Sequence, residues 1–481
     1  MAKKEVKKDV GITAEKDDFS EWFTQLMIKA DLADYTDVSG CIVFRPNSYA
    51  IWEKIQAECD KRFKKLGVKN AYFPLFISEK LLSKEAEHVK GFAPEVAWVT
   101  QAGETKLVER LAVRPTSEAI MYPSYSKWIR SWRDLPLRLN QWNNVVRWEF
   151  THPVPFLRTR EFLWNEGHSA FASEKEALAE GKELLGSYED VCENYLALYG
   201  LTGRKTEKEK FAGAVFTEKI HYIMPNGKAI EGAAFHHDGQ NFAKAYDIKF
   251  IDKNEKESYA WQNTYAISTR MLGVMFAIHS DDKGLMLPPK MALNQIVIVP
   301  ILFDDSKEKV LKKAKELEDK LSKFGAFVDE RENNPGFKFN DWEMKGIPIR
   351  LELGPKDLQN NQVVMVRRDS GKKEIIKIVE LEKKIPAILE DIQTSLFARS
   401  KKLFESKVEK ADTLGGLKRI IDNKKVGIVP LCNKEACENQ MKADTKGAKA
   451  LFISEEKVKK GAKCIICGVP AAYNIYAGKS Y

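Results

Sequence analysis

The sequence predicts an α+β domain, then an α/β domain, then a small module that contains most of the cysteines. Three observations support this division. Long amphipathic helices mix with aromatic-rich strands over residues 13–288. After "LPPK", short apolar strands alternate with Lys/Glu-rich helices, which is typical of α/β domains. Four of the seven cysteines lie beyond residue 430. A chain of 481 residues is long enough for several domains.

Composition excludes two classes of protein. No apolar run approaches the roughly 20 residues that span a bilayer, so no membrane partner is expected. The odd number of scattered cysteines argues against a secreted disulfide scaffold and predicts a cytoplasmic location. Residues 1–12 are basic without an apolar segment behind them, which predicts a disordered tail and no signal peptide. The net charge of +9 permits a polyanionic partner without demonstrating one.

Three elements of the first domain can be read directly. Residues 49–67 carry an apolar stripe at helical spacing that ends at Gly67. Residues 70–77, "NAYFPLFI", predict a strand in which Pro74 marks an edge or a bulge. Residues 175–200 predict another helix, ended by Gly200.

Residues 145–168, "VVRWEFTHPVPFLRTREFLWNEGH", predict a charge-rich antiparallel hairpin. Alternation places Arg147 and Glu149 on one face of the first strand, about 7 Å apart. A guanidinium binds phosphate oxygens bidentately, and a carboxylate accepts from an exocyclic amine such as that of adenine. Arg158 adds a second phosphate contact, and Phe162 offers a face on which a base can stack. The alternative is a surface ladder of cross-strand ion pairs.

The second domain, residues 289–400, predicts a mostly parallel or mixed sheet. Strands are expected at 295–303, 326–330, 347–354 and 362–369, with helices at 307–325, near 338–346 and at 385–406. The third module occupies residues 401–481.

The cysteines of this module form two short-spaced pairs. Four residues separate Cys432 from Cys437, two separate Cys464 from Cys467, and 26 lie between the pairs. Such spacing suits a tetrahedral, structural Zn²⁺ site, because each short loop brings two thiolates to one ion. The alternative is four ordinary free thiols.

Longer motifs resemble a known family. "GCIVFRPNSYAIWEKIQ…YFPLF", "RWEF…RTREF" and "ISTRMLGVMF" resemble the three signature motifs of class II aminoacyl-tRNA synthetases. "AVRPTSEAIMYPSYSKWIRSWRDLPLRLNQWNNVVRWEF", "GRKTEKEKFAG", "HHDGQNFAKAYDI", "GLMLPPK" and "KGIPIRLELGPKDL" resemble prolyl-tRNA synthetases of the archaeal/eukaryotic type. The resemblance covers nearly the whole chain after the first dozen residues.

The resemblance implies three domains with the boundaries already given. Residues 13–288 become a class II catalytic domain, an antiparallel sheet flanked by helices. Residues 289–400 become an anticodon-binding α/β domain, and residues 401–481 a zinc-binding-like module. Only 111 residues separate Arg158 from Arg270, so no editing domain is expected between them.

The resemblance also implies the ATP-binding residues. Arg147 matches the arginine that holds the α-phosphate of ATP and the substrate carboxylate, and Arg270 matches the arginine at the γ-phosphate. Both are the expected catalytic residues. Glu149 and Arg158 match contacts to adenine and the outer phosphates, and Phe162 matches the stacking platform.

Proline-binding positions are implied in the same way. Thr116 and Glu118 match residues that hold the imino group, and Arg147 holds the carboxylate. The pocket wall and its supporting shell match Trp164, Glu166, His168 and His236.

The implied reaction joins L-proline to tRNA(Pro) in two steps through a prolyl-adenylate, with ATP and Mg²⁺ and without a protein nucleophile. Rate then comes from positioning and charge neutralisation. Glu343 and Arg350 match positions that read guanines of the proline anticodon. Family members are homodimers built through the first motif, where Pro74 matches.

Four residues depart from the family pattern. Glu231 stands where Gln is usual, Ala234 where Thr is, Phe235 where a small Ser is, and Ala266 where Gly is common. An extra carboxylate at Glu231 is expected to change the local charge by about one unit and so to affect Mg²⁺ or substrate affinity. These departures keep two alternatives open: a class II synthetase for another amino acid, and a non-catalytic synthetase-like protein that binds tRNA.

Overall fold

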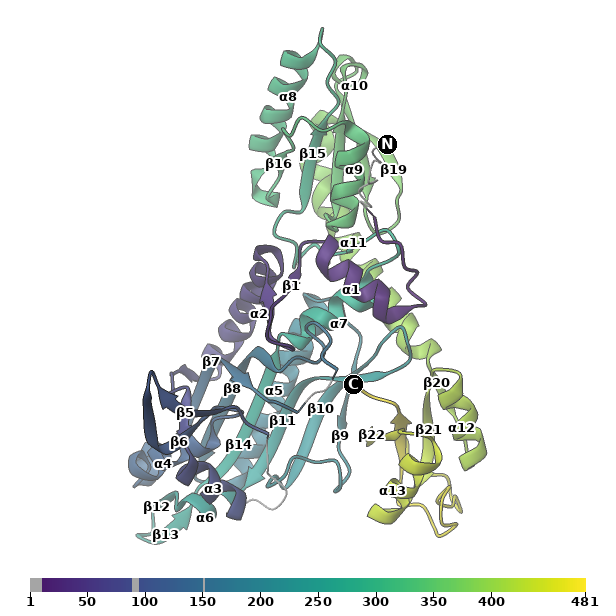
Figure 1. The fold of residues 1–481 in the computed structure, drawn as a ribbon. Coiled ribbons are helices and arrows are strands. Elements are labelled where there is room, and N and C mark those ends of the chain that lie inside the picture. Colours follow the sequence, from purple (N-terminus) through teal and green to yellow (C-terminus); the bar gives the residue numbers. More distant parts are fainter. Residues whose placement is uncertain (1–10, 89–94, 150–151) are drawn as a thin grey trace.

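The computed structural model describes residues 11–88, 95–149 and 152–481. Figure 1 shows a large lower body built around one sheet, an upper α/β domain, and the C-terminal module beside the edge of the large sheet. Most of the predicted tail lies outside the described residues. Ile12 already packs against the main core.

The central sheet has seven strands in the order β3-β7-β8-β14-β11-β10-β9. All neighbours pair antiparallel except β3 and β7, which are parallel. The strands are β3 Lys69–Asn70, β7 Leu137–Val146, β8 Glu161–Phe171, β14 Trp261–Ser268, β11 Ala229–Gly239, β10 Phe216–Ile223 and β9 Leu201–Arg204. The predicted antiparallel sheet flanked by helices is therefore confirmed.

Helices cover one face of this sheet. α5 (Glu174–Asn194) packs on β8, β11 and β14, and α2 (Pro46–Lys65) packs on α5. Ser173 caps α5 with a capping box to Glu176. The other helices of this body are α1 Phe19–Lys29, α3 Glu79–His88, α4 Glu118–Trp128, α6 Asn241–Tyr246 and α7 Arg270–His279, with a 3₁₀ turn at Trp132–Asp134.

Three smaller sheets complete the first domain. A three-stranded sheet has the order β4-β6-β5 and comprises Phe76–Ser78, Thr105–Val113 and Trp98–Ala102. Two hairpins are β1–β2 (Ala33–Tyr35, Ile42–Phe44) and β12–β13 (Lys249–Ile251, Glu257–Tyr259). The interval between Arg158 and Arg270 contains α5, α6, the β12–β13 hairpin and five strands of the central sheet.

The second domain is a mixed five-stranded sheet, as predicted. Its order is β16-β15-β17-β18-β19; β15 runs parallel to β16 and β17, and the last two strands are antiparallel. The strands are Phe327–Val328, Ile296–Pro300, Ile349–Leu353, Gln362–Arg367 and Lys373–Lys377 in that order. The helices are α8 Lys307–Lys320, α9 Pro335–Met344, α10 Pro355–Gln359 and α11 Leu381–Ser406, with 3₁₀ turns at Ser322–Phe324 and Ile378–Glu380.

The C-terminal module is a four-stranded sheet in the order β20-β21-β23-β22, with helices α12 (Leu414–Asp422) and α13 (Glu435–Asp444). Its strands are Val408–Lys410, Val426–Leu431, Tyr473–Gly478 and Lys449–Ile453 in that order. β22 contacts β9, so the module abuts the central sheet. None of the helices in the described part of the chain is long and apolar enough to cross a membrane.

Three predicted elements have other boundaries in the structure than the sequence indicates. Residues 70–77 are not one strand: β3 joins the central sheet and β4 the three-stranded sheet, because Pro74 lacks an N–H and the Phe73 N–H is bound to the Gln141 side chain at 3.1 Å. α5 stops at Asn194, six residues before Gly200. The first hairpin strand stops at Val146, so Arg147 and Glu149 lie beyond it.

Candidate functional site

The predicted hairpin is formed by β7 and β8. Val145 pairs with Phe162 and Val146 with Glu161, and the Arg147 N–H extends the ladder by one bond to the Arg160 carbonyl at 2.8 Å. Arg147 Nε donates to the Pro115 carbonyl at 2.9 Å. This bond fixes one end of the guanidinium.

Aromatic rings hold the other side of this arginine. The Arg147 guanidinium lies 5.5 Å from the ring centre of Phe162 and 5.3 Å from that of Trp164. Both rings come from β8, where alternate residues face the same side. Arg147 is therefore held in one orientation before any substrate binds.

One cavity collects nine of the eleven predicted ATP- and proline-binding residues. They are Thr116, Glu118, Arg147, Phe162, Trp164, Glu166, His168, His236 and Arg270. Glu149 and Arg158 are not among its lining residues. Glu149 is exposed beyond the end of β7, and Arg158 is half-buried. Burial lowers the pKa of Arg270; Glu231 opposes this, and the charges of Arg147 and Arg158 add to it.

Two buried carboxylates meet at one end of the cavity. Glu118 begins α4 and Glu166 lies on β8. The Thr116 hydroxyl contacts both, at 2.9 Å from Glu166 Oε1. The Ser117 N–H donates to Glu166 at 2.7 Å, and His168 Nε2 lies 3.2 Å from it. This end of the cavity can receive a small cationic group.

The two carboxylates differ in their affinity for a proton. Burial raises the pKa of Glu118. Burial acts in the same direction on Glu166, but the close contact with His168 and the hydrogen bonds from Ser117 and Thr116 outweigh it and lower the pKa of Glu166 to about 2. Burial opposes the charge on His168, yet its contact with Glu166 raises the pKa of the imidazole. Of the two carboxylates, Glu118 therefore binds a proton more readily than Glu166.

The extra carboxylate of Glu231 is neutralised locally. Its Oε1 accepts from Lys205 Nζ at 2.8 Å and its Oε2 from Lys219 Nζ at 2.7 Å. The expected gain of one negative charge is thus offset by two lysines. Each oxygen of Glu231 is therefore already engaged by a lysine.

The sequence reasoning missed these two lysines. The turn at "PNG", residues 225–227, indicates a hairpin of β10 and β11, and pairing of the two strands places Lys219 near Glu231. Lys205 lies outside this hairpin, so no local rule indicates it.

The other departures are divided between two faces of the sheet. Ala234 and Ala266 line the cavity. Phe235 points the opposite way, into the core under α5, where a Cβ on Gly181 would lie 2.5 Å from its ring. Phe235 is therefore accommodated by a glycine and does not narrow the cavity.

The four predicted zinc ligands come together in the C-terminal module. Their sulfur atoms lie within 4.8 Å of one another, and Cys432 Sγ is 3.8 Å from Cys467 Sγ. A tetrahedral ion with Zn–S bonds of about 2.3 Å sets its sulfurs roughly 3.8 Å apart, so the donor set fits zinc.

Backbone N–H groups favour the thiolate form of one of these ligands. Burial opposes ionisation of Cys464, but the N–H groups of Cys467, Cys432 and Ile466 outweigh it and lower the pKa of Cys464 to about 7. The coordinating form of this cysteine is therefore prepared by the fold.

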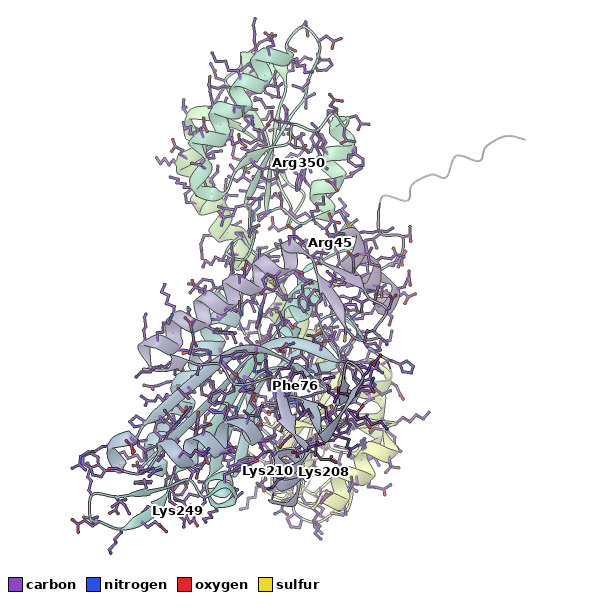
Figure 2. The ribbon with its side chains drawn as sticks, turned by 60° about the vertical axis from the view of Figure 1, so that its left-hand side comes forward. Arg45, Phe76, Lys208, Lys210, Lys249 and Arg350 are labelled. Carbon is purple, nitrogen blue, oxygen red and sulfur yellow. The ribbon has the colours of Figure 1, made fainter. Side chains whose placement is uncertain are left out.

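The predicted anticodon residues lie in the second domain. Arg350, labelled in Figure 2, is on β17; its Nη2 donates to Glu352 at 2.9 Å and its guanidinium stacks 4.4 Å from the Phe339 ring centre. Glu343 is near the end of α9 and lies 3.4 Å from Lys283 Nζ.

Comparison with known proteins identifies all three parts of the chain. Residues 100–279 match the family described as tRNA synthetase class II core domain (G, H, P, S and T). Residues 295–388 match Anticodon binding domain, and residues 415–481 match Prolyl-tRNA synthetase, C-terminal.

Whole-chain relatives agree with these matches. The proline–tRNA ligase of Ruminiclostridium cellulolyticum is 48% identical over 98% of both chains, and that of Natranaerobius thermophilus is 47% identical over 95% of both. The chain belongs to the proline–tRNA ligase family. The predicted family and its class II fold are thereby confirmed.

A solved structure of the same family has the same fold over its whole length. It is a prolyl-tRNA synthetase from Cryptosporidium parvum, complexed with halofuginone and AMPPNP, with a TM-score of 0.94 and 42% identity. The match covers 98% of this chain and 100% of that one. That family member binds an ATP analogue.

Proposed function

We propose that this chain is a proline–tRNA ligase whose cavity forms prolyl-adenylate from L-proline and ATP and transfers proline to tRNA(Pro). The convergence of nine predicted residues, from segments between Thr116 and Arg270, on one cavity carries this proposal. The relatives quoted above are proline–tRNA ligases, which favours proline over another amino acid.

The nucleotide is assigned to the arginine end of the cavity. Arg147 contacts the α-phosphate and the proline carboxylate, Arg270 the γ-phosphate, and adenine stacks on Phe162. Glu149 and Arg158 are proposed to reach adenine and the outer phosphates once ATP is bound. Mg²⁺ arrives with ATP and neutralises phosphate charge.

Proline is assigned to the carboxylate end. Glu118 and Thr116 receive its imino group. Trp164, His168 and His236 wall the ring, and Glu166 holds Thr116 and His168 in place. A secondary ammonium buried in a small pocket needs a paired carboxylate, which Glu118 supplies.

The two steps need positioning more than a protein nucleophile. The proline carboxylate attacks the α-phosphorus of ATP and pyrophosphate leaves. A ribose hydroxyl at the 3′ end of tRNA then attacks the prolyl carbonyl and AMP leaves. The arginines neutralise charge that grows on the phosphates.

Amino-acid-dependent exchange of pyrophosphate into ATP tests this proposal. Proline should support exchange and the other amino acids should not, and tRNA(Pro) should then be charged. Exchange with a different amino acid would contradict the proline assignment. A folded protein that neither exchanges nor charges would favour the non-catalytic alternative.

For anticodon recognition we propose Glu343 and Arg350. A guanidinium pairs bidentately with the edge of a guanine, and a carboxylate accepts from its amino group. Arg350 is already oriented by Glu352 and Phe339.

We also propose a cytoplasmic location, because none of the seven cysteines, all of them in described segments, forms a disulfide.

Zinc is proposed as a structural ion at Cys432, Cys437, Cys464 and Cys467. Purified protein is expected to contain about one zinc per chain, because the four thiolates form one complete tetrahedral site. That site has no open coordination position, which is typical of a structural ion. Substituting Cys464→Ser should lower the zinc content and the resistance of the C-terminal module to proteolysis. Metal analysis and limited proteolysis give the two readouts. Cys192→Ser, at a buried cysteine outside the cluster, is the matched control for zinc content. Full protease resistance in a zinc-free sample would contradict the structural role.

A homodimer is proposed through the β4-β6-β5 sheet. This sheet and the segment before it expose Tyr72, Phe76, Trp98 and Val108, which is unusual for a free surface. A second copy is the proposed occupant because Pro74, the position matched to the family's dimer motif, lies in this segment. Wild-type protein should sediment at about twice 54.9 kDa. Val108→Asp should shift it toward the monomer, whereas Val379→Asp, at an exposed valine of the second domain, should not. A monomeric wild-type protein would contradict the proposal.

A further inference from the structure

The C-terminal module packs against the segment that leads from β9 to β10. Phe452 of β22 lies directly on Gly203, where a Cβ would come within 2.1 Å of its ring. The same ring lies 4.5 Å from the centre of the buried His221 imidazole, whose pKa burial lowers to about 3. A neutral imidazole and a glycine thus allow the module to approach the central sheet closely.

Polar contacts continue along this segment. The Thr206 hydroxyl donates to Glu438 at 3.0 Å, and Lys208 bonds to Asn439. Lys449 lies 3.7 Å from Glu209. Figure 2 labels Lys208 beside the C-terminal module. The interface between the two parts is therefore made by charged and polar groups as well as by Phe452.

Lys205 connects the module to the cavity directly. Its side chain is almost completely buried, and its Nζ donates to the Leu451 carbonyl of β22 at 2.7 Å and to Glu231 Oε1 at 2.8 Å. Burial lowers the pKa of Lys205 although Glu231 opposes this. A buried ammonium needs both acceptors, because loss of either one leaves the Lys205 charge poorly compensated.

Glu231 links Lys205 to the residues at the proposed nucleotide end of the cavity. Its second oxygen binds Lys219, and its backbone carbonyl accepts from Arg270 Nη1 at 3.2 Å. Glu231, Lys219 and Arg270 all line the cavity. A chain of direct contacts therefore runs from β22 through Lys205 to the proposed phosphate end.

We propose that Lys205 is a positioning residue for adenylate formation, through which the C-terminal module holds Glu231 and Lys219 beside Arg270. This inference rests on the proposed function and adds to it a role for the module in the chemistry of the cavity. Without Lys205, the Glu231 carboxylate has one cation in place of two and turns toward Arg270. There it competes with the phosphates of ATP.

The test measures proline-dependent pyrophosphate exchange in full-length variants. Lys205→Met is expected to lower kcat/KM for ATP by about 10-fold, with the KM for proline changed by less than about 2-fold. Adding Glu231→Gln should restore kcat/KM for ATP to within about 3-fold of wild type, because the uncompensated carboxylate is gone. Lys410→Met, which removes an exposed pair with Glu456 in the same module, is the matched control and should match wild type.

Two results would overturn the inference. One is a Lys205→Met enzyme with a lower Tm but an unchanged kcat/KM for ATP. The other is an equal loss in the presence and absence of Glu231→Gln. If Lys205→Met does not fold, Phe452→Leu loosens the same interface from the module side and should lower kcat/KM for ATP by about 3-fold; no loss in folded Phe452→Leu would then overturn it. Failure of the proposed function differs from all of these, since wild type itself would show no exchange with proline.

Discussion

Replacing Arg147 by alanine is expected to lower kcat/KM for ATP in pyrophosphate exchange by about 1,000-fold. The guanidinium is fixed by the Pro115 carbonyl and by the rings of Phe162 and Trp164. A preoriented cation stabilises charge in the transition state without reorganising. Because Arg147 is also assigned to the proline carboxylate, kcat/KM for proline should fall as well.

One further variant separates charge from geometry at this position, and a second provides a control. Arg147→Lys keeps a positive charge but loses the bond to Pro115 and the planar fork, so it should recover only a small part of the activity. Arg133→Ala is the matched control, because Arg133 is an exposed arginine that also stacks on a tryptophan, 4.7 Å from the Trp132 ring centre. It should retain wild-type exchange. A loss below about 10-fold in Arg147→Ala would exclude this residue from the transition state.

The hairpin of β7 and β8 shows what alternation can predict and where it stops. The pattern of the sequence places Phe162, Trp164, Glu166 and His168 on one face of β8, and all four line the cavity. The same rule fails for Glu149, because β7 ends at Val146 and the Trp148 N–H turns away to the Glu95 carbonyl. Local periodicity holds only as far as the ladder continues.

Long-range pairing explains the other differences. Glu231 looks like an added negative charge in the sequence, yet Lys205 and Lys219 neutralise it in the fold. Phe235 looks like an obstruction, yet Gly181 of α5 leaves room for its ring. The hairpin of β10 and β11 indicates Lys219, but Lys205 and Gly181 cannot be found from residues close in sequence, since both depend on which helix or loop packs on the sheet.

The family resemblance supplied what local rules could not. Residues 70–77 illustrate the limit: the apolar run predicts one strand, and Pro74 divides it between two sheets. The resemblance places this segment in the first signature motif but gives no hydrogen bonds. Those depend on Gln141 and Arg114, which bind the N–H and carbonyl of Phe73 from distant parts of the chain.

Replacing Glu118 by glutamine is expected to lower kcat/KM for proline by about 100-fold, while the KM for ATP changes little. Glu118 is buried and is the proposed partner of the imino cation, and a neutral amide cannot compensate that charge. Glu118→Asp keeps the charge on a shorter side chain and should lose less. A Glu118→Gln enzyme with normal kcat/KM for proline would remove Glu118 from the pocket's recognition of proline.

The pH dependence of kcat/KM for proline provides an independent test of the role of Glu118. Burial raises the pKa of Glu118, so its carboxyl group keeps a proton to a higher pH than an ordinary glutamate does, and the imino cation competes with that proton. The charged and titratable groups around it are His168, Glu166 and Asp238. The contact with Glu166 raises the pKa of His168, and burial raises the pKa of Asp238 well above its usual value. Raising the pH removes the proton from Glu118, so kcat/KM for proline should rise with pH above the usual titration range of a glutamate and then level off. In Glu118→Gln this rise should disappear. A rise that persists in Glu118→Gln would assign the titration to a different group.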